Sequence, residues 1–141
     1  MTTPHHWVEY AQDWRHEPMA YWVHMEPAGQ AWKDATHYEP PAPARVHGKG
    51  YPVLCIEVGD TTLRFSSQPQ LSEFLRTMAL TPLPTSLRLS RLRAGAAGPN
   101  AHWLSRLPAK LKSPKGRRAA LAAVEHVVKV LKSGMSSRAV A

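Results

Sequence analysis

The chain has 141 residues, a formal net charge of +8 and a single cysteine. This length suits one domain that buries a core without metal or disulfides, and a lone cysteine excludes the class of disulfide-stabilised scaffolds. Because 43% of the residues are hydrophobic, the composition is that of a folded protein and excludes a wholly disordered one.

The charge is distributed unevenly along the chain. Residues 1–80 contain six Lys or Arg and nine Asp or Glu, whereas residues 81–141 contain twelve Lys or Arg and one acid, Glu125. Such an asymmetry predicts that the C-terminal half attracts a polyanion or an acidic protein face. No apolar run approaches the about 20 residues of a membrane helix, and the N-terminus lacks a signal-peptide pattern. We therefore expect a cytoplasmic protein with no membrane contact.

The first third of the chain is rich in aromatic residues. Trp7, Tyr10 and Trp14 recur at helical spacing, which predicts a helix over residues 4–16. The β-branched and aromatic stretch at residues 20–25 predicts a strand.

A hairpin is the clearest local pattern in the sequence. It follows residues 30–50, which are predicted to form a long extended loop with at most one helical turn near residues 30–34. Residues 52–58 and 61–66 are β-rich and flank Gly59-Asp60, a pair that suits a tight turn. One face of the hairpin is expected to enter the core, and it carries Leu54, Ile56, Val58, Leu63 and Phe65.

Two helices have clear start signals. Ser67 is the expected cap of a helix over residues 69–79, whose apolar stripe is Leu71, Phe74, Leu75 and Met78. Ser113 caps the other, with Pro114 in its first turn and Gly134 just past its end. Less regular patterns predict short helices over residues 85–95 and 101–107, the latter with Trp103, Leu104 and Leu107 directed inward.

Together these elements predict an α+β fold. A small antiparallel sheet, with strands at 20–25, 52–58 and 61–66, is packed by helices that include a long C-terminal one. Residues 1–134 form a single domain with a basic C-terminal half, and residues 135–141 form a flexible tail.

The segment NAHWLSRLPAKLKSPKGRR, residues 100–118, carries six cations and no acid. Cations crowd the start of the last helix, where exposed backbone N–H groups also favour anions such as phosphate. Three more arginines precede this segment. The candidate nucleic-acid-binding residues are Arg88, Arg91, Arg93, Arg106, Lys110, Lys112, Lys115, Arg117 and Arg118.

Three other interpretations of these cations stay open. They form a solvated surface without a partner, or they bind an acidic protein, for which the tryptophans of residues 1–32 supply interface anchors. Alternatively, residues 69–79 and 85–94 form a helix-turn-helix, although two prolines between them weaken this pattern.

Patterns that carry catalysis or bind cofactors are weak. The eight histidines lack metal-ligand spacing, no glycine-rich phosphate loop follows a strand, and Cys55 lies within a predicted strand. We therefore expect no catalytic residue, no metal and no cofactor. The alternatives are a metal pair around His16 with Asp13 and Glu17, and a nuclease site that uses Glu57, Asp60 and a histidine.

The sequence thus predicts a non-catalytic protein that binds DNA or RNA, mainly through backbone contacts, with its basic C-terminal surface. The alternative is a protein–protein regulator or inhibitor that binds an acidic partner, for example a complex that processes nucleic acid.

Overall fold

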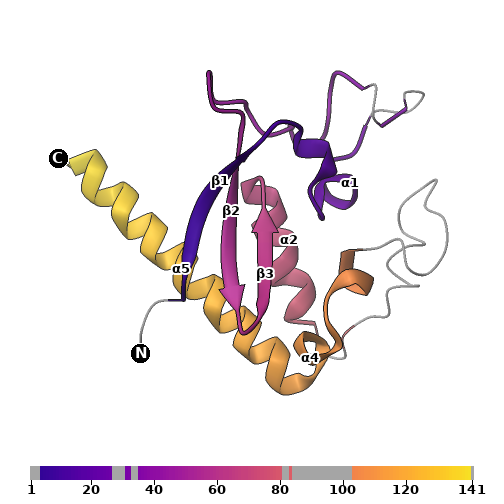
Figure 1. Ribbon diagram of the computed structural model, residues 1–141, viewed down its shortest axis with the longest axis vertical. Coiled ribbons are helices and arrows are strands. Elements are labelled where there is room, and N and C mark those ends of the chain that lie inside the picture. The colour runs from indigo at the N-terminus through magenta and orange to yellow at the C-terminus, as the bar shows by residue number, and fades with distance from the viewer. Residues whose placement is uncertain (1–3, 27–30, 33–34, 81–82, 84–102, 141) are drawn as a thin grey trace.

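A computed structural model describes residues 4–26, 31–32, 35–80, 83 and 103–140. Its elements in chain order are β1 (His6–Ala11), the 3-10 helix η1 (Trp14–His16), α1 (Ala20–Val23), β2 (Tyr51–Val58), β3 (Thr61–Phe65), α2 (Gln68–Met78), the 3-10 helix η3 (Trp103–Arg106), α4 (Ala109–Lys112) and α5 (Pro114–Val140). The strands form one antiparallel sheet in the order β1-β2-β3, and α2 and α5 pack against the same face of it (Figure 1). The predicted α+β class, the three-stranded sheet and the long C-terminal helix are confirmed.

The hairpin of β2 and β3 forms as predicted. Val58 pairs with Thr61 across a two-residue turn, and Gly59 adopts a φ of 63°, the left-handed conformation that such a turn requires. Ile56, Val58, Leu63 and Phe65 are buried in the core, and Leu54 packs against its margin. Val53 and Cys55, on the opposite face of β2, are also fully buried. The central strand is therefore covered on both faces.

The predicted N-terminal helix over residues 4–16 is wrong, because residues 6–11 form strand β1. Trp7 pairs with Cys55 and Glu9 with Val53 in the register of the sheet. The Trp7 indole donates a hydrogen bond to the Glu9 carboxylate at 2.9 Å, a contact between residues i and i+2 that places both side chains on one face of a strand. Pairing with β2 overrides the helical spacing of the aromatic residues.

The predicted strand at residues 20–25 is also wrong. Residues 20–23 form the short helix α1, in which Val23 N–H bonds to the Met19 carbonyl at 3.1 Å. Only Met25 keeps a strand-like contact, an isolated bridge to Glu39. Burial of Met19 and Ala20 in the core decides this conformation over the β propensity of the stretch.

A second apolar cluster lies beside the main core. It is formed by Trp14, Ala20, Ala35 and Tyr38. The described part of the predicted loop is irregular, as expected, and its isolated bridges join Met25 to Glu39 and Val46 to Gly50. The turn predicted near residues 30–34 falls largely outside the described residues.

His24 joins this second cluster to helix α2. Its side chain is fully buried. One ring nitrogen lies 2.9 Å from the Pro40 carbonyl, and the other lies 2.8 Å from the Ser67 hydroxyl. Burial, the larger effect, lowers the pKa of His24, so the ring is neutral, donates to the carbonyl and accepts from the hydroxyl.

Helix α2 begins at Ser67 as predicted, since the Ser67 hydroxyl accepts a hydrogen bond from Gln70 N–H at 3.3 Å. Helix α5 also begins at its predicted cap, Ser113, whose hydroxyl accepts from Gly116 N–H at 3.1 Å. Its predicted stop at Gly134 is wrong, because the helix continues to Val140. A glycine costs a helix only about 1 kcal/mol relative to alanine.

The segment before α5 is less helical than predicted. Only residues 103–106 of the predicted 101–107 helix are described as helical, and they form a 3-10 helix. Trp103, Leu104 and Leu107 are buried, as predicted. The predicted helix over residues 85–95 lies outside the described residues. Over the ranges that the structure covers, no helix has the length and apolar character to cross a membrane.

Candidate functional site

A tight corner between α4 and α5 gathers five of the predicted cations. Ser113 stands between the two helices, and its hydroxyl donates a hydrogen bond to the Lys110 carbonyl at 2.9 Å while it caps α5. A β-carbon on Gly116 would overlap the same carbonyl. Only glycine therefore lets α4 approach α5 so closely. The cations that this corner brings together are Lys110, Lys112, Lys115, Arg117 and Arg118.

Two of these five cations are engaged within the protein. Lys110 forms an ion pair with Asp60 in the turn between β2 and β3. Arg117 is half-buried and donates from a terminal guanidinium nitrogen to the Leu80 carbonyl at 3.1 Å. The pair of Lys110 and Asp60 is exposed, so it holds the corner to the hairpin only weakly.

The other three cations of the corner are wholly or partly accessible to solvent. Lys115 and Arg118 are exposed, and Lys112 is half-buried. Within the described ranges, no ion pair joins any of the three to an acid.

Helix α5 extends this cationic surface beyond the corner. Lys129 and Lys132 are exposed, and their spacing of 14 residues from Lys115 and Arg118, about four helical turns, places all four on one side of the helix. Glu125 is the only acid among the exposed residues of this helix whose side chains are described. The residues that we call the basic helix face are Lys112, Lys115, Arg118, Lys129 and Lys132.

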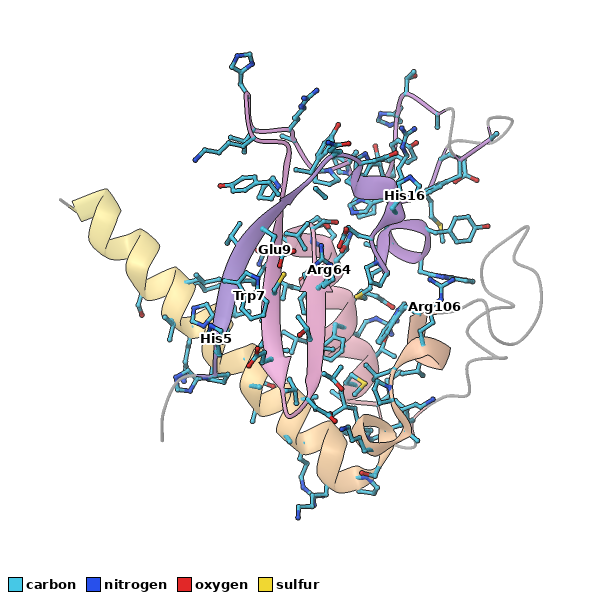
Figure 2. All side chains as sticks on the ribbon, in the orientation of Figure 1. His5, Trp7, Glu9, His16, Arg64 and Arg106 are labelled. Atoms are coloured by element: carbon cyan, nitrogen blue, oxygen red, sulfur yellow. The ribbon has the colours of Figure 1, made fainter. Side chains whose placement is uncertain are left out.

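Of the remaining predicted site residues, Arg106 lies elsewhere and three arginines are not described. Arg106 is exposed on η3, apart from the corner and close to the right-hand side of the sheet (Figure 2). Arg88, Arg91 and Arg93 lie outside the described residues. The structure thus brings together the cations of residues 110–118, separates Arg106 from them, and adds Lys129 and Lys132. A helical spacing of three and four residues could have identified these two additions.

Most acids of the chain are engaged close to β1–β3 and α2. Arg64 binds two of them, with its guanidinium nitrogens 2.8 Å from Glu17 and 2.9 Å from Glu9. Asp13, Asp60 and Glu73 also form ion pairs with lysine or arginine, whereas Glu39 and Glu57 contact histidines. Asp60 pairs with Lys110 of the corner, but within the described ranges no carboxylate pairs with a cation of the basic helix face.

A pocket of about 210 Å³ lies beside strand β3, and no pattern in the sequence predicts it. All five residues of β3 line it, together with side chains from α2, η3 and the segment before α1. Its wall includes the apolar residues Phe74, Trp103 and Leu107. Arg106 and His16 also line it, and both are exposed.

The polar face of the sheet does not assemble a nucleophile. Cys55 lies beneath Arg64, 3.7 Å from one of its nitrogens. Burial, the dominant effect, raises the pKa of the Cys55 thiol, and a reactive cysteine needs the opposite shift. Glu17, an alternative metal ligand in the sequence analysis, forms an ion pair with Arg64. In the part of the chain that the structure covers, no three His, Cys, Asp or Glu side chains gather as metal ligands.

These features define two surfaces, the basic helix face and the pocket beside β3. Comparison with protein-family models, with curated proteins and with solved structures finds no match for this chain.

Proposed function

We propose that the protein binds nucleic acid without catalysis, through phosphate contacts of the basic helix face. The observation that supports this most is the separation of charges. Arginines hold four carboxylates of the N-terminal half in local ion pairs, whereas the five cations of the basic helix face have no ion-pair partner in the described part of the chain. Uncompensated cations on one face attract a polyanion.

The dimensions of the face suit a nucleic-acid backbone. Lys115 and Lys132 are 17 residues apart, which corresponds to about 26 Å along a helix. Phosphates follow one another at about 3.4 Å along each strand of a duplex, measured on its axis. The face therefore spans about seven phosphates. Lysines outnumber arginines on it, which favours contacts to the backbone over base reading.

Salt dependence gives the direct test of this proposal. If the five cations of the face each neutralise one phosphate, the logarithm of the duplex association constant falls with the logarithm of salt concentration with a slope of about −4 to −5. Fluorescence anisotropy with labelled duplex DNA, single-stranded DNA and RNA measures this slope. No binding to any of the three at 20 mM salt, or a slope close to zero, would refute the proposal.

A pair of double variants separates the face from overall charge. Lys115→Glu with Arg118→Glu is expected to weaken binding equally for every sequence and to lower the slope by about 2. Arg45→Glu with Lys49→Glu changes the net charge by the same amount at another exposed site and serves as the control. Equal losses in both double variants would show that the helix face has no special role.

The second candidate function is binding of an acidic protein as a regulator or inhibitor. The pocket beside β3 favours it, because an apolar wall next to a strand edge suits a polypeptide better than a phosphate backbone.

A further inference from the structure

Strand β3 forms one edge of the sheet, and its outer backbone groups are open. In an antiparallel pair, alternate residues direct both backbone groups at the partner strand. Val58 and Thr61 close the two-residue turn, so Thr61, Leu63 and Phe65 point their groups at β2, whereas Thr62 and Arg64 point theirs outward. Ser66 keeps the same alternation, since its N–H turns away from β2 and donates to the Gln70 side chain at 2.9 Å.

The outer backbone groups of this edge have no hydrogen-bond partner outside the strands within the described ranges. The backbone N–H and C=O groups of Thr62 and Arg64 form no hydrogen bond to any described residue outside the strands. Two N–H donors and two C=O acceptors, alternating along the strand, match the pattern that another strand presents.

The pocket lies along the same edge and supplies a site for a side chain. Its volume is about 210 Å³, more than the about 150 Å³ of an apolar protein cavity that admits benzene. The side chains of an added strand alternate between the two faces of the sheet. Residues on the core side therefore enter the pocket against Phe74, Trp103 and Leu107.

The charged residues around the pocket indicate which polar residues a binding partner should carry. Arg64 is already neutralised by Glu9 and Glu17. Arg106 and His16 are exposed and line the pocket (Figure 2), and His16 is near Asp13 at 3.4 Å. Arg106 has no ion-pair partner in the described part of the chain. An incoming segment with carboxylates between its apolar residues is complementary to this rim.

We propose that the edge of β3 and its pocket bind an extended segment of an acidic partner protein by strand addition. The segment adds a fourth strand beside β3, places an apolar side chain in the pocket and directs acidic side chains toward Arg106. A second copy of this chain suits the site less well, because two molecules of charge +8 would bring their Arg106 side chains to a shared edge. The site is separate from the basic helix face and does not depend on nucleic-acid binding.

The test uses the full chain and a fluorescein-labelled heptapeptide, Glu-Val-Glu-Phe-Glu-Val-Glu. We expect saturable binding by fluorescence anisotropy in 0.15 M salt, together with slower hydrogen exchange of the Thr62 and Arg64 amides. The same peptide methylated at every backbone amide nitrogen presents no N–H group to a neighbouring strand, and it is expected to bind at least tenfold more weakly. Equal binding of both peptides, or no binding of the parent at 1 mM, would overturn the proposal.

Variants of the protein locate the binding. Thr62→Pro removes an outward N–H but no hydrogen bond to β2, as edge prolines do, and is expected to reduce affinity at least tenfold, whereas Thr62→Ala changes it less than twofold. Arg106→Glu tests the rim without changing the strand, and we expect at least a fivefold loss. Unchanged affinity in Arg106→Glu and unchanged exchange of the two amides would overturn the proposal even where Thr62→Pro does not fold.

Two further outcomes distinguish this site from its alternatives. The double variant Lys115→Glu with Arg118→Glu is expected to retain peptide binding within threefold, so loss of nucleic-acid binding and loss of peptide binding are separable. Sedimentation that shows a dimer abolished by Thr62→Pro, with no peptide binding, would replace the acidic segment by a second copy and refute the proposal.

Discussion

Replacing Gly116 by alanine tests the corner that gathers the cations of α4 and α5. Alanine is favoured over glycine in a helix by up to about 1 kcal/mol, so the sequence alone predicts a more stable protein. The structure predicts the opposite. A β-carbon at this position overlaps the Lys110 carbonyl oxygen, lies 2.7 Å from its carbon and lies 2.9 Å from the α-carbon of Leu111. All three are backbone atoms, so no side-chain rotation relieves the contact.

The loss of stability in Gly116→Ala follows from the need to move α4 away from α5. Overpacking of this kind costs about 1–3 kcal/mol, and moving α4 also weakens the Ser113 cap, which is worth about 1 kcal/mol. After subtraction of the helix-propensity gain, Gly116→Ala is expected to lower the free energy of unfolding by about 1–3 kcal/mol. Leu111, buried on α4, adds to the loss if it is displaced.

Urea unfolding followed by tryptophan fluorescence measures this change. With a slope of about 2 kcal/mol per molar urea, the expected loss moves the midpoint down by about 0.5–1.5 M. Ser133→Ala, at an exposed position of the same helix, is the control, and we expect a midpoint equal to or slightly above that of the parent protein. A Gly116→Ala protein as stable as the parent would show that α4 does not pack against α5 as described.

Three further predictions concern polar groups around the sheet. Burial lowers the pKa of His24, so as pH falls the unfolded chain takes up a proton before the folded protein does. The free energy of unfolding is therefore at its full value above about pH 6.5 and declines below it, by at most about 1.4 kcal/mol per pH unit. His24→Gln should flatten this dependence in urea titrations between pH 5 and 8. Ser67→Ala removes both the cap of α2 and a partner of His24, so calorimetry should show a loss of about 1–3 kcal/mol; a loss below 0.5 kcal/mol would contradict this double role. Arg64→Met leaves the Glu17 side chain, 9% exposed, without its cation, so thermal unfolding should occur at a lower temperature than in Glu9→Gln, whose carboxylate is more exposed.

The parts of the fold that could be predicted from the sequence are those with local signals. A two-residue turn at Gly59-Asp60 sets the register of the hairpin, and Ser67 with an apolar stripe sets the start and buried face of α2. These signals depend on neighbouring residues only, so the local conformations that they favour are kept in the folded protein.

The errors arise where distant contacts decide the conformation. Trp7, Tyr10 and Trp14 have helical spacing, yet β2 offers residues 6–11 a strand partner 40 to 50 residues away. The order of the strands follows from this pairing, and so does the open edge of β3. The predicted sheet, with a strand at residues 20–25, does not indicate a pocket beside β3.

The candidate site was predictable only in part for the same reason. The cations of residues 110–118 are neighbours in the sequence, so any fold keeps them close together. Their partners are not neighbours, since Asp60 and Leu80 lie far from Lys110 and Arg117 along the chain. Sequence reasoning therefore found the cluster but not which of its members are engaged.

The covered position of Cys55 has a practical consequence. The thiol lies between β1 and β3 under the Arg64 side chain and is 0% exposed. Alkylating reagents reach it only when the groups that cover it move aside, and the chain has no other cysteine to compete. The rate at which such a reagent modifies the native protein thus reports how often this face of the sheet becomes uncovered. The molecule carries its own single-site probe of that motion, with no engineered label.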